Sequence, residues 1–151
     1  MGVSFEFDLK KFGADVASVR KNTTGSQLGN AALAGILLIR EFIKFNIQAR
    51  GLVDTAALLN RWVFGLEKTS GTSVGAFTGT DKIYARIHEF GGVITPKTAK
   101  ALHFQIDGHW VTTRSVTMPA RPYVRPALDE NKPEVANAII GVLQGQVDHG
   151  R

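Results

Sequence analysis

The clearest pattern of apolar and polar positions in the chain runs from Gln27 to Arg50. Apolar residues recur there every three or four positions, the spacing of one face of an α-helix. Ser26 is expected to cap this helix and Gly51 to end it. The pattern therefore predicts a long helix that packs on a core through Ala32, Ile36, Ile39, Ile43 and Ile47.

A second apolar row widens the buried surface of this predicted helix. It consists of Leu33, Leu37, Leu38, Phe42 and Phe45. Such a wide face is typical of a helix buried on more than one side within the core. It also suits a helix that touches a neighbouring subunit, and both interpretations stay open.

Shorter patterns predict the elements around the long helix. Alternation from Val3 to Leu9 predicts a strand, and apolar spacing from Leu9 to Arg20 predicts a helix. Asp54 is expected to cap one or two helical turns, and Arg61 to Glu67 reads as a strand. The Gly-, Ser- and Thr-rich stretch from Lys68 to Gly79 is expected to be a mobile loop.

The second half of the chain carries a helix signal and a hairpin signal. Ile83 to Phe90 has helical spacing and ends at Gly91-Gly92. Between Leu102 and Val116, Asp107-Gly108 separates two extended runs, as in a tight β-hairpin. This register pairs Ile106 with His109 and Phe104 with Val111 on one side, and turns Trp110, Gln105 and His103 to the other.

Proline spacing sets the expectation for the C-terminal part. Pro119, Pro122 and Pro126 are expected to hold an extended path, and a last helix is expected to begin near Pro133. This helix would carry Val135, Ile139, Ile140 and Leu143. The fold predicted is α+β: a mostly antiparallel sheet with a long β-hairpin packed against one long helix, and shorter flanking helices. We expect one domain over residues 1–145 and a loose tail over 146–151.

Composition narrows the class of protein. A chain of 151 residues, 44% of them hydrophobic, is long enough for one globular domain. It has no cysteine, which excludes disulfides, thiolate metal sites and cysteine nucleophiles. No export signal or membrane-spanning stretch is expected, because the N-terminal pattern is acidic and the longest apolar run is short. The net charge of +5 is spread along the chain and permits, without requiring, contact with DNA or an acidic partner.

Sequence motifs for catalysis or metal binding are incomplete. His88-Glu89 lacks the second histidine of a zinc-protease helix, because Gly92 stands at that position. His103 and His109 project from opposite faces of the predicted hairpin. Lys68-Thr69 lacks the glycines of a phosphate-binding loop, and no serine lies in a nucleophile elbow. We therefore expect no enzyme activity, no metal and no cofactor.

Three segments, in this order, resemble the virion-morphogenesis and neck protein family of lambdoid and Mu-like tailed phages. Gly51 to Leu59 is similar to a Pro-x-Asp-Thr-Gly-x-Leu stretch after a long helix, with Leu52 and Ala56 in place of the proline and glycine. Ile83 to Gly92 resembles a Tyr-Ala-x-x-x-Glu-Phe-Gly signature. Pro119 to Leu128 resembles an Arg-Pro-Phe-Leu-Arg-Pro-Ala-Leu stretch.

The resemblance implies a structural virion protein that forms a ring at the head-tail junction, where it completes the neck and forms part of the DNA exit channel. The partners implied are other copies of the chain in a hexamer or dodecamer, head-closure or connector proteins, and tail terminator or tail tube proteins. Genomic DNA would pass through without sequence-specific binding, and no membrane is involved. The location implied is the neck or tail region of the virion, and the host cytoplasm during assembly.

The residues expected at an assembly interface lie in the second and third of these segments. They are Arg121, Pro122, Tyr123, Arg125, Pro126, Glu89 and Phe90. Arginine forks bind carboxylates, tyrosine gives a rigid contact, and prolines lower the ordering cost on docking. The alternative is that the stretch is a stiff connector between the hairpin and the last helix. A structural role is favoured for Glu89 and Phe90, with Phe90 in the core and Glu89 bound to a backbone amide or an arginine.

Other functions remain as alternatives. The nearest is a tail terminator or minor tail subunit in the same assembly. A small basic DNA-binding protein is more distant and would lose affinity steeply with salt. A small hydrolase is the least supported, because no catalytic constellation is evident.

Overall fold

The computed structural model describes residues 3–7, 24–52, 57–70 and 73–148. The elements follow in the order β1 (Val3–Phe7), α2 (Gly25–Ala49), α3 (Ala57–Asn60), β2 (Val63–Ser70), β3 (Ser73–Thr80), α4 (Ile83–Phe90), β4 (Gly92–Ile94), β5 (Leu102–Ile106), β6 (His109–Thr113), β7 (Val116–Met118), α5 (Val124–Asp129) and α6 (Lys132–Asp148). Strands and helices share a core, so the predicted α+β class is confirmed. The helix predicted over Leu9 to Arg20 and the cap predicted at Asp54 lie outside the described residues.

Helix α2 begins with a capping box, one turn of reciprocal bonds between side chain and backbone. The Thr24 hydroxyl accepts a hydrogen bond from the Gln27 amide at 3.4 Å, and the Gln27 side chain accepts one from the Thr24 amide at 2.8 Å. Threonine followed three residues later by glutamine is the pattern of this motif. The prediction of Ser26 as the cap was therefore wrong, and Ser26 lies inside the helix.

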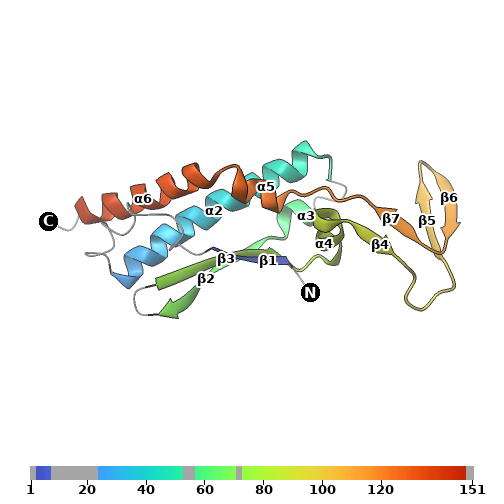
Figure 1. Ribbon diagram of the computed structural model, residues 1–151, viewed down its shortest axis with the longest axis horizontal. Coiled ribbons are helices and arrows are strands. Elements are labelled where there is room, and N and C mark those ends of the chain that lie inside the picture. Colours follow the sequence, from blue (N-terminus) through green and yellow to red (C-terminus); the bar gives the residue numbers. More distant parts are fainter. Residues whose placement is uncertain (1–2, 8–23, 53–56, 71–72, 149–151) are drawn as a thin grey trace.

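The long helix is central because two layers cover it. On one side Leu66 of β2 reaches the helix at Gly29, and on the other Ile139 of α6 packs against Gly35. Figure 1 shows α6 and α2 side by side, with the sheet along the other side of α2. The predicted apolar stripe is confirmed as buried, as is the last helix, whose core residues are Val135, Ile139 and Leu143.

The second apolar row of α2 is divided between the core and the surface. Leu33, Leu38 and Phe42 pack against the core, which matches the interpretation of a helix buried on more than one side. Leu37 and Phe45 are exposed, Phe45 to 66% of its surface. The width of the apolar face is thus explained mostly within one chain.

The main sheet contains three antiparallel strands in the order β1-β3-β2. Its central strand β3 presents Ala76, Thr78 and Thr80 as buried side chains. The prediction of a mobile loop from Lys68 to Gly79 was wrong. Glycines are interspersed with these small and β-branched residues, which suits a central strand with a helix packed closely on it. The same composition is typical of a loop, and this explains the error.

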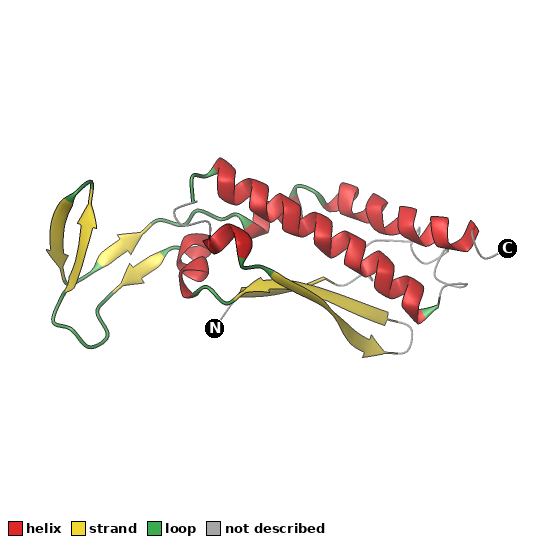
Figure 2. Cartoon of the chain, turned by 180° about the vertical axis from the view of Figure 1, so that it is seen from behind, coloured by secondary structure: helices red, strands yellow, loops and turns green. Residues whose placement is uncertain are grey.

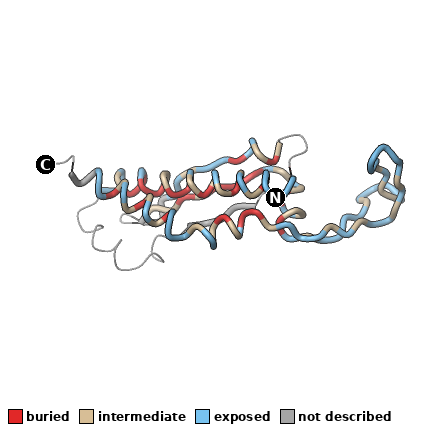
Figure 3. The backbone as a smooth tube through the Cα atoms, turned by 90° about the horizontal axis from the view of Figure 1, so that it is seen from above, coloured by how far each residue is buried: buried red, intermediate tan, exposed pale blue. Residues whose placement is uncertain are grey.

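The hairpin lies outside this sheet, in an arm that extends from the body (Figure 2). Strands β4 and β7 form its two-stranded stem, and β5 and β6 form the hairpin beyond it. The predicted register is confirmed, with Ile106 opposite His109 and Phe104 opposite Val111. The expected packing of the hairpin against the long helix was wrong: Figure 3 shows the buried residues in the body, while the arm is exposed or partly exposed along its length.

The proline-rich segment contains a helix that was not expected. Helix α5 includes Pro126 near its start, where a missing backbone N–H costs little because first-turn amides have no acceptor within the helix itself. The prediction of an extended path through Pro126 was therefore wrong beyond Tyr123. Helix α6 also runs past Gly145, the expected end of the domain, to Asp148.

Candidate assembly site at the root of the arm

The arm joins the body where α4 meets the start of α5, and Glu89 holds this joint together. Its side chain is only 3% exposed. One carboxylate oxygen accepts hydrogen bonds from the amides of Tyr123 at 2.8 Å and Val124 at 3.0 Å, and the other accepts one from Arg125 at 3.0 Å. The next residue, Pro126, has no backbone N–H. Every amide N–H present at the start of α5 therefore has an acceptor. A charged acceptor at a helix N-terminus also complements the helix dipole.

Further backbone contacts fix the same joint. The Arg121 amide donates to the His88 carbonyl at 2.7 Å, and the Asn46 side chain donates to the Tyr123 carbonyl at 3.0 Å. Gly91 has φ +68°, and a Cβ there would lie 2.7 Å from the backbone nitrogen of Ala120. The strand leaving α4 and the strand returning from the arm are therefore in direct backbone contact, which sets the direction of the arm.

Tyr123 is a core residue at the centre of this joint. It is fully buried, its hydroxyl donates to the Ala85 carbonyl at 3.0 Å, and its ring meets Trp62 edge-on at 6.2 Å. Burial raises the pKa of the Tyr123 hydroxyl far above its usual value, and the nearby Glu89 carboxylate adds to this. The hydroxyl therefore remains a donor at any physiological pH.

Burial corrects part of the predicted interface. Tyr123 and Glu89 cannot touch a neighbour, because both are enclosed within one chain. Glu89 binds backbone amides, as one of its two predicted structural roles required. Phe90 was expected in the core but is 53% exposed, since it lies on the side of α4 that faces away from Ala85 and Glu89.

The other predicted interface residues surround the joint at the surface. Arg121 and Arg125 are exposed, whereas Pro122 and Pro126 are partly buried. Their contact with a neighbour stays a prediction. The roles of Asn46 and of the close packing at Gly91 were not predicted; for the packing, the glycine pair after α4 was the one signal in the sequence.

His88 gives this joint an expected pH dependence. Its ring nitrogen Nδ1 is buried and has no partner among the described residues. Burial lowers the pKa of His88 below 6.5, and the Arg121 guanidinium lowers it further. As the pH falls below 6.5 the unfolded chain takes up a proton that the folded chain resists, so stability decreases.

We expect His88→Gln to flatten the loss of unfolding free energy between about pH 7 and 5, measured by urea denaturation, with the exposed His109→Gln as control. An unchanged slope would contradict this.

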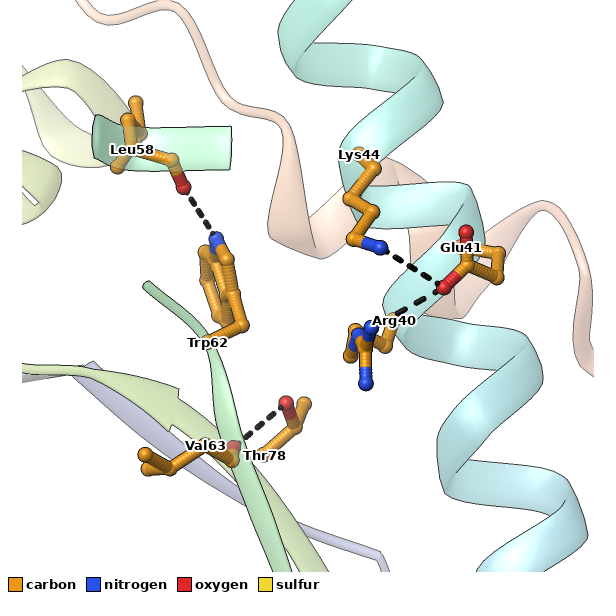
Figure 4. A network of polar contacts seen from close by, with 7 residues as sticks. All are labelled: Arg40, Glu41, Lys44, Leu58, Trp62, Val63 and Thr78. Atoms are coloured by element: carbon orange, nitrogen blue, oxygen red, sulfur yellow. Dashed lines mark hydrogen bonds and ion pairs between the residues drawn. The ribbon is translucent and has the colours of Figure 1, made fainter. Parts of the chain in front are cut away.

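Several polar side chains elsewhere in the body have partners within the chain. Figure 4 shows Glu41 between Arg40 and Lys44, at 3.6 and 3.1 Å, and the Trp62 indole donating to the Leu58 carbonyl at 2.6 Å. Within the described part of the chain, no three His, Asp or Glu side chains gather where a metal ion could be held. No helix in that part has the length and apolar character needed to cross a bilayer.

Comparison with protein families matches residues 56–147 to the phage virion morphogenesis family. The chain belongs to this family. No curated protein and no solved structure matches it. The match covers α4, the arm, α5 and α6, and therefore includes both sides of the joint at Glu89. The family assignment makes this a bacteriophage protein with a structural or assembly role in the virion.

Proposed function

We propose that this virion morphogenesis protein is a ring-forming subunit of the neck, the assembly that completes the tail and joins it to the DNA-filled head. The observation that carries the proposal is the arm, which is held rigidly at its root and lacks support from the body beyond it. An isolated two-stranded ribbon is marginally stable in water, so an arm of this kind requires a partner surface. A subunit of a closed assembly provides such a surface.

The expected partners follow from this position. Other copies of the chain form the ring, in a hexamer or dodecamer, and head-closure or connector proteins and tail terminator or tail tube proteins lie on its two sides. DNA passes through the opening without sequence-specific contacts. The exposed Arg121 and Arg125 at the joint suit carboxylates of such neighbours.

The test is loss of the chain during phage growth. Infection with a phage that carries an early stop codon in this gene is expected to give filled heads and complete tails that do not join, seen by electron microscopy. Adding the purified chain to the lysate should restore infectious particles. Antibody labelling of wild-type virions should mark the junction between head and tail.

The alternative in the same assembly is a tail terminator or minor tail subunit, and the same experiment separates the two. Loss of a terminator would leave tails of irregular length, and label would lie on the tail itself. Normal joined particles without the chain would exclude both roles.

A further inference from the structure

The hairpin at the end of the arm has one apolar and one polar face. Leu102, Phe104, Ile106 and Val111 share one face, because alternate residues of a strand point to the same side. The other face holds Gln105 and Thr112 with the stacked rings of His103 and Trp110, 4.6 Å apart. Two strands cannot cover such an apolar face by themselves, and Ile106 remains 51% exposed.

The body has a complementary open edge along β2. Among the described residues this strand pairs only with β3, so within that part of the chain its other edge has no strand partner. Natural edge strands are usually protected by lysine, proline or a bulge. Val63 to Leu66 has none of these, and the irregularity in β2 comes later, between Lys68 and Ser70.

The layer beneath α2 is also incomplete at this edge. Phe64 and Leu66 are each 41% exposed, although their neighbours on β3, Thr78 and Ala76, are buried. Leu66 reaches α2 at Gly29 and Phe64 lies under the Arg40 guanidinium, 5.4 Å from the ring centre. The exposed Leu37 is three residues before Arg40, so the two are neighbours on the surface of α2. We call Leu37, Phe64 and Leu66 the ledge.

We propose that the hairpin of one copy adds to the β2 edge of a second copy, so that its apolar face continues the inner face of that sheet and covers the ledge. One strand of the hairpin would supply the missing backbone partners of β2. Ile106 and Phe104 would then lie beside Phe64 and Leu66 under α2. Backbone pairing with matched apolar faces is the usual basis of strand addition.

The geometry of the arm favours a second copy over the same chain. The joint at Glu89 and Gly91 directs the arm away from the body, and the hairpin lies far from β2 (Figures 1 and 2). Each chain thus carries both a ribbon that needs cover and an edge that needs a strand, at separate places. Such a contact joins one surface of each copy to a different surface of the next copy. Repeated from copy to copy, it generates a ring when the rotation between neighbouring copies closes on the first copy. This inference rests on the proposed function and names the contact that builds the ring.

The absence of cysteine allows a direct test by disulfide cross-linking. Phage particles are assembled with the double variant Ile106→Cys with Phe64→Cys, or Ile106→Cys with Leu66→Cys, in place of the wild-type chain, then oxidised. All three positions are exposed, so the substitutions should not prevent folding. We expect a ladder of covalent multiples of the chain for at least one of the two pairs, on a gel without reducing agent, and no multiples for each single variant.

Two matched controls use residues that are also large, apolar and exposed. Trp110 lies on the opposite face of the hairpin, and Phe45 lies on α2 but outside the ledge. The pairs Trp110→Cys with Phe64→Cys and Ile106→Cys with Phe45→Cys should give no ladder. A ladder only with Phe45 would overturn the proposed docking place, and no ladder with any pair in particles that contain the chain would overturn the inference. Particles that lack the chain altogether would instead contradict the proposed function.

Discussion

Replacing Glu89 by alanine is expected to lower the free energy of unfolding by about 3–5 kcal/mol. The substitution removes a buried carboxylate that accepts three backbone hydrogen bonds and leaves the amides of Tyr123, Val124 and Arg125 without an acceptor. Each unsatisfied buried donor costs about 1–3 kcal/mol, and water entering the cavity offsets part of this. The measurement is urea denaturation followed by circular dichroism, with the slope on denaturant compared between variants.

Two further variants identify the cause of this loss. Glu89→Gln keeps one acceptor oxygen and the side-chain volume, so its effect should lie between those of alanine and the wild type. Glu130→Ala removes an exposed carboxylate from the same region and should change stability by less than about 0.5 kcal/mol. If Glu89→Ala were as mild as Glu130→Ala, the amides would have other acceptors and the joint would not depend on this carboxylate.

Local sequence patterns predicted those parts of the fold that depend only on residues close together in the chain. The stripe from Ala32 to Ile47, the end of α4 at Gly91 and the hairpin register at Asp107-Gly108 all follow from spacing or turn chemistry. Asp107 at φ 49° and Gly108 at φ 81° adopt the positive φ angles that a tight hairpin turn requires. Such features need no knowledge of the rest of the chain.

The errors arose where a distant segment decided the outcome. Strand β3 had the composition of a loop, and only its place between two strands and beneath α2 explains its glycines and threonines. Pro126 was read as a helix breaker, although Glu89, far away in the sequence, stabilises a helix start around it. The hairpin was expected to pack against the long helix, and the sequence contains no sign that it lies in an arm outside the body.

The candidate site shows the same division. The resemblance named Glu89, Phe90 and residues in the segment from Arg121 to Pro126 as an assembly interface, and the structure brings the two segments together at the root of the arm. It did not separate the residues that hold the joint from those that face outward. Burial makes that separation: Glu89 and Tyr123 are internal, while Phe90, Arg121 and Arg125 are available to neighbours.

Gly91→Ala is expected to be the second most damaging small substitution, with a loss of about 2–4 kcal/mol in unfolding free energy. Two costs combine in it. Alanine at φ +68° is strained, and its Cβ would lie 2.7 Å from the Ala120 nitrogen and 2.9 Å from the Met118 carbonyl oxygen. Both are backbone atoms of the segment that returns from the arm, so no side-chain rotation relieves the contact and the backbone itself must move.

Gly51→Ala provides the matched control for this substitution. Gly51 has a similar φ of +63°, but nothing lies within 4 Å of the position of its Cβ. It should therefore lose only the conformational part, about 1 kcal/mol. Hydrogen exchange adds a local readout, because the Arg121 amide bonded to the His88 carbonyl should lose protection in Gly91→Ala and keep it in Gly51→Ala. Equal losses of stability in the two variants, with Arg121 equally protected, would mean that the arm and the body are not in backbone contact at Gly91, and that the direction of the arm is set elsewhere.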